Sequence, residues 1–481
     1  MTSIPGSYEG IAHYEKNGEI LFTAQTGGIF NAENNFMEGA TGIFFDDSSA
    51  EMCISPDPAD PNRYYVIYNN EKCSNLYYSV VDMTLNGGLG DVVNLNTLIS
   101  EENFSEGLEV VAQPLSNDFW LLTYKCGIGF TRFTINENGI NEEQLLYSFD
   151  PGISYDGRGE LDYHKGRMGA AFAYSNKVFA AGFNPITGEI CDATVIEDDN
   201  FSSSFTGSYG IEFSPSGNKM YFSIWYNTGN NQIYQYDFNT QTYTGYSLVM
   251  DTPFNGFGEM ELAPNGKIYV MMDNYNKLMV IENPDEAIPI FNTIVLPGTT
   301  ALGMSDPIQS YVYNDLIYQT DSLCSIPNMP LQLNAHSNYD SYNWATSDDP
   351  ETTIGTEATL NIDFSDTTQV YYLEGTNGNA CFSAFEHFTV FPIPEIDAGP
   401  DLTITSGESI QLQSINNTQG AQVIWFPNTG LDDPFANQPI ASPTETTTYL
   451  MSAYVGPCQE VDEVTITVDP MVSVAPVPVP Q

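Results

Sequence analysis

Basic side chains are scarce in this chain. Its 481 residues include 12 Lys and Arg against 62 Asp and Glu, which gives a formal net charge of −50, and residues 319–481 contain no Lys or Arg. Such a surface repels the phosphates of nucleic acids and anionic lipid head groups. We therefore expect no nucleic-acid partner, and we expect high salt or bound divalent cations to screen the repulsion within the chain.

Long apolar runs are missing as well. No stretch approaches the roughly 20 residues that a helix needs to cross a bilayer, so we expect no direct membrane span. The segment Met1-Thr-Ser-Ile-Pro-Gly-Ser-Tyr8 lacks the basic and apolar regions of a secretory signal. The chain is therefore either cytosolic or a mature or excised piece of an exported protein, and its composition favours the piece.

Catalytic and nucleotide-binding motifs are absent. The chain has only four His, and it contains no Gly-x-Ser-x-Gly, no Walker A phosphate loop and no Rossmann fingerprint. The seven Cys form no CxxC motif or Cys/His cluster, so neither a zinc site nor a redox centre is predicted. These absences give nucleophilic catalysis and nucleotide binding no support.

The cysteines leave two pairings open. Cys53 and Cys73 flank a predicted hairpin, and Cys324 and Cys381 lie near the two ends of one predicted domain, so either pair could form a disulfide. Buried thiols are an equally good interpretation of both pairs. Because the number of cysteines is odd, at least one thiol is left outside any disulfide within the chain.

A strand–turn–strand phrase recurs through the first part of the chain. Its clearest copies are Glu212-Phe-Ser-Pro-Ser-Gly-Asn-Lys-Met-Tyr-Phe222 and Glu261-Leu-Ala-Pro-Asn-Gly-Lys-Ile-Tyr-Val270, where Pro and Gly set a tight turn between β-forming runs. Looser copies have turns near residues 18, 61, 117 and 176. The spacing fits propeller blades of roughly 40–50 residues, with insertions in the middle repeats.

We therefore predict an all-β protein whose residues 1–318 form a β-propeller. Six phrases predict six blades, and Tyr311-Val-Tyr-Asn-Asp315 either starts a seventh or helps to close the ring. The 30 Tyr and 28 Phe of the chain agree with β-structure. The alternative is a set of unrelated hairpins in a sandwich.

Residues 319–394 and 395–470 read as two tandem sandwiches of the Ig-like or PKD-like kind. Short strands are spaced as in a sandwich, and Trp344 and Trp425 occupy matching positions in the two segments, as do Tyr371 and Tyr449. The last residues, 471–481, are a Pro-Val tract typical of an extended linker, which suggests that another segment follows it.

The densest charged cluster runs from residue 156 to residue 167. We predict that it forms an entry loop at the propeller mouth that binds a sugar or a metal through Asp156, Arg158, Glu160, Asp162 and His164. A solvated loop between blades is the plainer interpretation. Acidic pairs on turns, such as Asp348-Asp349 and Asp432-Asp433, could hold a structural Ca²⁺, although none matches an EF-hand.

Three stretches resemble large secreted proteins of Bacteroidota, in which a propeller precedes tandem PKD-like or Ig-like modules. They are Leu76-Tyr-Tyr-Ser-Val-Val-Asp-Met-Thr-Leu-Asn-Gly-Gly-Leu-Gly-Asp-Val92, Gly303-Met-Ser-Asp-Pro-Ile-Gln-Ser310, and Trp425-Phe-Pro-Asn-Thr-Gly-Leu-Asp-Asp-Pro434 taken with Pro443-Thr-Glu-Thr-Thr-Thr-Tyr449. The resemblance implies type IX secretion to the cell surface and a role in gliding motility, adhesion or appendage building. It implies no catalytic residues.

Two functions from different classes follow. The first is an extracellular adhesin or appendage subunit, with the propeller as head, the sandwiches as stalk, and other copies of the chain, other surface proteins or glycans as partners. The second is a secreted polysaccharide-active enzyme, a lyase or glycosidase, with its site in the propeller. Convergent acids with a Tyr or His in an axial pocket would favour the enzyme, whereas a plugged axis would count against it.

Overall fold

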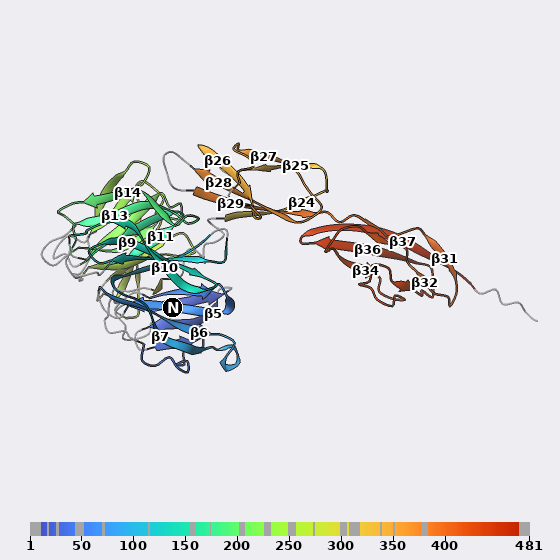
Figure 1. The fold of residues 1–481 in the computed structure, drawn as a ribbon, viewed down its shortest axis with the longest axis horizontal. Coiled ribbons are helices and arrows are strands. Elements are labelled where there is room, and N and C mark those ends of the chain that lie inside the picture. Colours follow the sequence, from blue (N-terminus) through green and yellow to red (C-terminus); the bar gives the residue numbers. More distant parts are fainter. Residues whose placement is uncertain are drawn as a thin grey trace, which may run out of the picture. The chain divides into compact units, whose positions relative to one another are not determined.

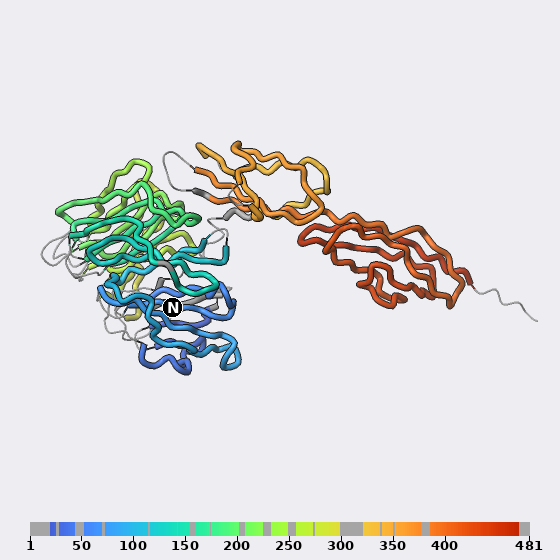
Figure 2. The backbone as a smooth tube through the Cα atoms, viewed as in Figure 1, coloured from blue at the N-terminus to red at the C-terminus, as the bar shows by residue number. Residues whose placement is uncertain are grey.

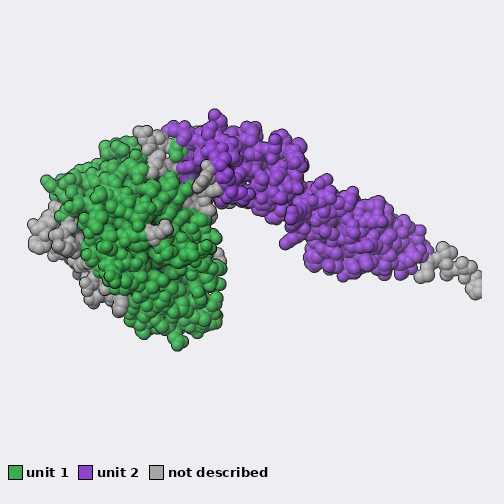
Figure 3. All heavy atoms as spheres, viewed as in Figure 1, with its two compact units in different colours: residues 1–317, 376–384 green, residues 318–375, 385–481 purple. Residues whose placement is uncertain are grey.

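The computed structural model describes residues 11–16, 19–25, 28–43, 52–69, 73–113, 116–152, 159–173, 175–201, 207–225, 232–248, 256–272, 275–298, 305–306, 318–336, 339–349, 352–376 and 383–470. The chain divides into two compact units (Figure 3). Unit 1 comprises residues 1–317 and 376–384, and unit 2 comprises residues 318–375 and 385–481. The predicted blade start or closing segment at 311–315 and the linker at 471–481 lie outside the described residues.

The described residues of unit 1 form five sheets. Four of them contain four strands each, and the fifth contains seven (Figure 1). In chain order the strands are β1 (Ile11–Lys16), β2 (Glu19–Gln25), β3 (Gly28–Asn31), β4 (Met52–Asp57), β5 (Asp60–Asn69), β6 (Ser74–Asp82), β7 (Asp91–Ala112), β8 (Phe119–Lys125), β9 (Gly129–Asn136), β10 (Gly139–Ser148), β11 (Leu161–His164), β12 (Arg167–Ala170), β13 (Lys177–Asn184), β14 (Glu189–Glu197), β15 (Gly207–Phe213), β16 (Lys219–Trp225), β17 (Gln232–Asp237), β18 (Thr242–Ser247), β19 (Phe257–Leu262), β20 (Ile268–Met272), β21 (Lys277–Ile281), β22 (Phe291–Val295) and β23 (Ser305–Asp306).

The seven-stranded sheet is two blades joined by one strand. The first part of β7 pairs with β6, and its last part, from Phe104 onward, pairs with β8. The strand therefore leaves one blade at its outer edge and becomes the first strand of the next. Counted in this way, the described part of unit 1 has six blades: β23-β1-β2-β3, β4 to β7, β7 to β10, β11 to β14, β15 to β18 and β19 to β22.

The blades follow one another as a ring. One strand of each blade packs against the corresponding strand of the next: β1 against β4, β4 against β7, β7 against β11, β11 against β15, and β15 against β19. Except in the first blade, where β23 lies before β1, these are the first strands of their blades. The apolar clusters also span neighbouring blades: the ring centroid of Phe179 on β13 lies 4.3 Å from that of Phe130 on β9 of the blade before it. At the far end, β23 pairs in parallel with β1 and joins the last segment of the ring to the first. Unit 1 is a β-propeller, and Figure 2 follows its chain from blue to yellow.

One of the six predicted strand–turn–strand repeats lies one hairpin later in its blade than predicted. The stretch 172–179 was expected to hold the first turn of the fourth blade, but it contains the turn between β12 and β13. The first hairpin is β11–β12, whose turn is Lys165-Gly166 with φ of 47° and 74°. Gly166 supplies the positive φ that a tight hairpin requires, without the Pro that marks the turns of the next two blades.

Unit 2 contains two modules with separate cores. The first module has β24 (Tyr318–Ser325), β25 (Pro330–Asn334), β26 (Ser341–Thr346), β27 (Thr359–Asp363), β28 (Gln369–Thr376) and β29 (Ser383–Pro392). The second has β30 (Ile396–Asp397), β31 (Leu402–Thr405), β32 (Ile410–Gln411), β33 (Ile415–Asn416), β34 (Gln422–Phe426), β35 (Ile440–Ala441), β36 (Thr447–Val455) and β37 (Cys458–Asp469). The larger sheets have matching orders, β24-β29-β28-β26 and β31-β37-β36-β34. In the first sheet β24 pairs in parallel with β29, and in the second β31 pairs in parallel with β37.

A buried tryptophan lies at the same point of each module. Trp344 on β26 and Trp425 on β34 are at most 1% exposed. Each indole donates its N–H to a backbone carbonyl, that of Glu357 at 2.8 Å and that of Ala436 at 3.1 Å. Pairing the indole N–H in this way removes the cost of burying it in an apolar core.

The disulfides differ from both predicted pairings. Cys73, at the turn before β6, bonds to Cys126 beside the β8–β9 turn, and Cys324 on β24 bonds to Cys458 at the start of β37. Cys53 takes part in neither bond, and its side chain is buried in the apolar core that β4 shares with the next blade. Cys381 lies outside the described residues.

Two features of this fold bear on location. Disulfides persist in oxidising surroundings, so the two bonds indicate an extracellular or periplasmic environment. Among the described residues there is no helix of the length and apolar character that crossing a bilayer requires.

Candidate functional site

Buried carboxylates line the first strands of four consecutive blades. We call them the inner-strand carboxylates, and none is more than 9% exposed: Glu106 and Glu109 on β7, Glu160 and Asp162 at β11, Glu212 on β15 and Glu259 on β19. Burial of a carboxylate is costly unless hydrogen bonds or charges compensate for it. The partners of these groups therefore decide whether they serve chemistry or the fold.

Backbone amides of the next blade satisfy several of these carboxylates. Glu160 accepts a hydrogen bond from the N–H of Ile211 at 2.5 Å, which joins the fourth blade to the fifth. Glu212 accepts one from the N–H of Leu262, which joins the fifth blade to the sixth. Its other oxygen accepts the N–H of Phe213 at 2.5 Å. These carboxylates hold neighbouring first strands together.

Asp162 and Glu212 form a carboxyl pair. Burial, followed by the charge of Glu212 and a hydrogen bond to it, raises the pKa of Asp162 well above its ordinary value. Because two carboxylates repel each other, one proton shared between them is the stable arrangement. Asp162 therefore keeps a proton that an exposed aspartic acid would lose.

The first strands are too close together for additional side chains at two points. A Cβ added to Gly210 on β15 would lie 2.2 Å from the carbonyl oxygen of Gly258 on β19. A Cβ added to Gly107 on β7 would lie 3.0 Å from the Cβ of Leu161 on β11. Glycine allows this approach of one backbone to another. The carboxylates thus lie in a close-packed part of the ring.

A second polar group lies at the turns of the fourth and fifth blades. The carbonyl oxygen of Pro215 accepts hydrogen bonds from Lys165 Nζ at 2.6 Å and from His164 Nε2 at 3.2 Å. Burial lowers the pKa of Lys165, and the charge of Asp285 acts against this. Both side chains are therefore used to hold the turn of the following blade.

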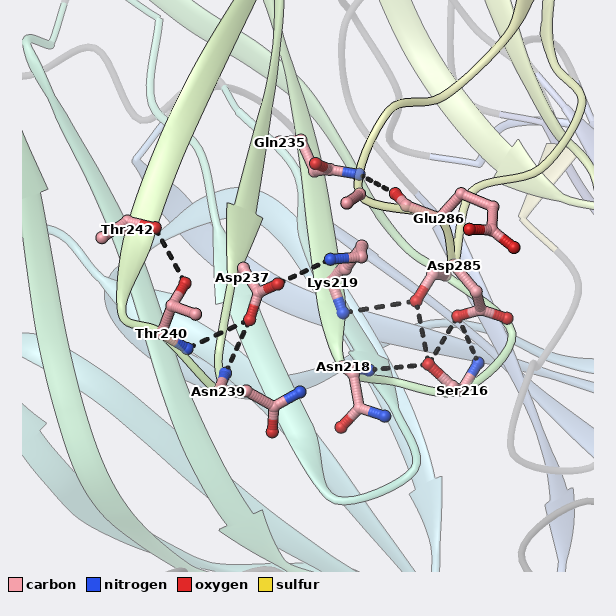
Figure 4. A network of polar contacts seen from close by, with 12 residues as sticks. Ser216, Asn218, Lys219, Gln235, Asp237, Asn239, Thr240, Thr242, Asp285 and Glu286 are labelled. Atoms are coloured by element: carbon pink, nitrogen blue, oxygen red, sulfur yellow. Dashed lines mark hydrogen bonds and ion pairs between the residues drawn. The ribbon is translucent and has the colours of Figure 1, made fainter.

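The same face carries the network drawn in Figure 4. Asp285, from the loop between β21 and β22, accepts hydrogen bonds from the N–H of Ser216 at 3.1 Å and from its hydroxyl at 2.5 Å. Gln235 donates to the carbonyl oxygen of Glu286 at 3.0 Å. Beside them, Lys219 contacts Asp237 at 2.6 Å. The fifth blade therefore holds a loop of the sixth with polar contacts.

The structure divides the predicted entry loop. Asp156 and Arg158 lie outside the described residues, whereas Glu160, Asp162 and His164 are 9%, 5% and 3% exposed. These three residues do not lie in an open loop: Asp162 and His164 belong to strand β11, and Glu160 directly precedes it. Sugar or metal binding by the cluster stays a prediction. Their alternation was a signal of a strand, and both faces of this strand are buried.

Sequence reasoning missed the other inner-strand carboxylates. The signal was present, since a glycine precedes an acid on each of these first strands: Gly107-Leu-Glu109, Gly159-Glu160, Gly210-Ile-Glu212 and Gly258-Glu259. Only the packing of first strands against one another shows that these acids meet from blade to blade.

Metal ligands do not gather in the described residues, where no group of three or more His, Cys, Asp or Glu side chains could hold an ion. Some acids of the predicted Ca²⁺ pairs have other roles. Asp432 accepts the N–H of Ile440 at 2.7 Å, and Asp433 accepts that of Phe435 at 2.9 Å. A structural Ca²⁺ stays a prediction.

Comparisons with known proteins add little. No family model and no curated protein matches the chain. Similar solved structures include the Dos1 propeller (10% identity, TM-score 0.42, 61% of this chain and 72% of that one). Others are the periplasmic gluconolactonase PpgL of Pseudomonas aeruginosa (12%, 0.39, 74% and 95%) and apo AztD of Citrobacter koseri (15%, 0.34, 62% and 76%). At such scores these similarities carry no argument about function.

Proposed function

We propose that the protein is an exported cell-surface binding or assembly protein of the adhesin or appendage kind. Unit 1 is its contact head, and the two modules of unit 2, which we assign to the Ig-like or PKD-like class, are its spacer. Its proposed origin is the type IX-secreted, gliding-associated proteins of Bacteroidota. Its partners are other copies of the chain, other surface proteins or glycans.

The observation that carries the proposal is the use of the inner-strand carboxylates. A glycosidase or lyase in the propeller would need acids that reach a substrate. Glu160 and Glu212 are instead buried and accept backbone N–H groups of the next blade. Their chemistry supports cohesion of the ring rather than turnover.

Charge supports the same proposal. Several of the few basic side chains form ion pairs within unit 1, such as Arg63 with Asp82 at 3.0 Å and Lys125 with Glu143 at 2.6 Å. Most acids have no basic partner in the sequence at all, since they outnumber Lys and Arg 62 to 12. Such a surface suits partners that are cationic, or that are bridged by divalent cations.

A glycan array with and without Ca²⁺, run beside a turnover assay on the same glycans, tests the proposal. We expect binding without turnover, and binding unchanged in Asp162→Asn and Glu212→Gln variants that remain folded. Turnover by the wild-type protein that either substitution abolishes would instead establish the enzyme. If no glycan binds, concentration-dependent self-association measured by analytical ultracentrifugation is the expected result, and a monomer without any binding would contradict the proposal.

A further inference from the structure

We propose that the two modules of unit 2 are fixed to each other by the Cys324–Cys458 disulfide and a packed turn, so that they act as one stiff spacer. The inference deepens the proposed function, because it concerns how the spacer presents the head. It depends on covalent connections within unit 2 and needs no knowledge of the ligand.

The modules have two covalent connections instead of one. The backbone passes from β29, which ends at Pro392, to β30, which begins at Ile396. The disulfide joins β24, the first strand of the first module, to the start of β37, the last strand of the second, across 134 positions of sequence. Domains linked by backbone alone move relative to each other by default. A second connection at a different point removes most of that freedom.

The two ends of the disulfide differ in exposure: Cys324 is exposed, whereas Cys458 is buried against the first module. Cys458 is 1% exposed, and its Sγ lies 3.9 Å from the carbonyl oxygens of Leu323 and Phe391, which belong to the other module. Thiol–disulfide exchange requires a thiolate to reach one of the two sulfurs, and only Cys458 is buried. While the bond is intact, it holds the buried Cys458 against the first module.

A turn of the second module packs on the first. Gly456, in the β36–β37 turn, has φ of 55°, and a Cβ added there would lie 2.5 Å from the ring of Phe391 at the end of β29. Only glycine fits both the backbone conformation and the space. This contact acts together with the nearby disulfide and opposes rotation of the second module relative to the first.

The test measures the distance between the modules in the full chain. Spin labels are attached through bioorthogonal residues at exposed Thr368 and Thr444, and the distance distribution is recorded by pulsed electron spin resonance.

We expect a single narrow distance distribution for the wild-type protein. For a C324S/C458S variant we expect a distribution about twofold broader or more, because a lone backbone linker permits domain motion. A C73S/C126S variant, which lacks a disulfide inside unit 1, is the matched control and keeps the narrow distribution.

Equal widths for the wild-type protein and C324S/C458S would overturn the proposal. Hydrogen exchange around Trp344 and Trp425 checks that both cores remain folded in the variant. If they do not, Gly456→Val, which keeps the disulfide, is used; the proposal then predicts a broader distribution, and an unchanged one contradicts it. The distance measurement uses no ligand, so its outcome does not depend on whether the glycan array detects binding. A change in the width of the distance distribution likewise does not bear on glycan binding, so the two proposals can fail separately.

Discussion

The carboxyl group of Asp162 on β11 hydrogen bonds to that of Glu212 on β15, the first strand of the next blade. Glu212 in turn accepts the N–H of Leu262 on β19. Three consecutive blades are therefore connected through two buried acids. Since burial and the neighbouring charge hold a proton on Asp162, cohesion of this part of the ring depends on pH.

The pH dependence has a definite sign. The pKa of Asp162 is raised above its unfolded value of 3.8, so its contribution to stability is full below that value and is lost as pH rises through the folded pKa. We expect Asp162→Asn to lose less stability than the wild-type protein as the pH rises above about 4, because the variant has no carboxyl proton to lose at this position. Urea unfolding of unit 1 across this range measures the difference.

Asp82→Asn is the control with the opposite sign. Hydrogen bonds from Thr84 and the ion pair with Arg63 lower the pKa of Asp82. This substitution should therefore cost stability near neutral pH and cost less as pH falls below about 4. Parallel pH profiles for the two variants would contradict the shared proton between Asp162 and Glu212.

The close approach of β15 and β19 predicts a cost for Gly210→Ala. The added Cβ would meet the backbone oxygen of Gly258, which cannot rotate away as a side chain would. We expect unit 1 to lose roughly 1–3 kcal/mol, as for other overpacked sites. Gly298→Ala, where a Cβ meets nothing within 4 Å, is the matched control. Calorimetry of both variants shows whether only the first lowers the melting temperature.

Alkylation tests the cysteine pairing. The Cys53 thiol is 5% exposed, so it should react with iodoacetamide only after the protein is denatured. Peptides containing Cys73, Cys126, Cys324 or Cys458 should react only after reduction. Mass spectrometry after pepsin digestion reads out both steps, and pepsin is needed because trypsin has no site after Lys277. Labelling of Cys73 without a reductant would contradict the Cys73–Cys126 bond.

We expect the stability of the first module of unit 2 to depend on Glu386. It is 2% exposed and accepts hydrogen bonds from the backbone N–H of His336 at 2.8 Å, from the His336 ring at 2.9 Å and from the Tyr339 hydroxyl at 2.9 Å. Glu386→Ala leaves these groups without this acceptor, so we expect a loss of roughly 1–3 kcal/mol. Faster hydrogen exchange around Trp344 measures it. Exposed Asp366→Ala should change nothing, and equal effects of the two substitutions would refute the role of Glu386.

Local patterns predicted much of the fold. Strands around the Pro-Ser-Gly turn of the fifth blade lie within a few residues of their predicted positions, because that turn fixes the hairpin register. The displaced hairpin of the fourth blade shows the limit. Lys165-Gly166 is a weaker turn signal than residues 172–179, yet the pairing of β11 with β12 selects it.

The candidate site was less predictable. An alternating run of charges at residues 156–167 has the same composition whether it lines an open mouth or an inner strand. The pKa of Asp162 is raised because the residue is buried and because Glu212, 50 positions later, lies on the first strand of the next blade. Disulfide partners depend on the same kind of distant contact, which explains why Cys324 pairs with Cys458 instead of a nearer cysteine.

By itself, the sequence determined the charge of the surface, the β-character of the chain and the recurrence of hairpins, because composition and turn residues act over a few positions. Tertiary structure alone decided which acids are buried, which cysteines bond and which glycines must remain small. Those outcomes depend on strands that are distant in sequence and meet only when the ring closes or the modules join.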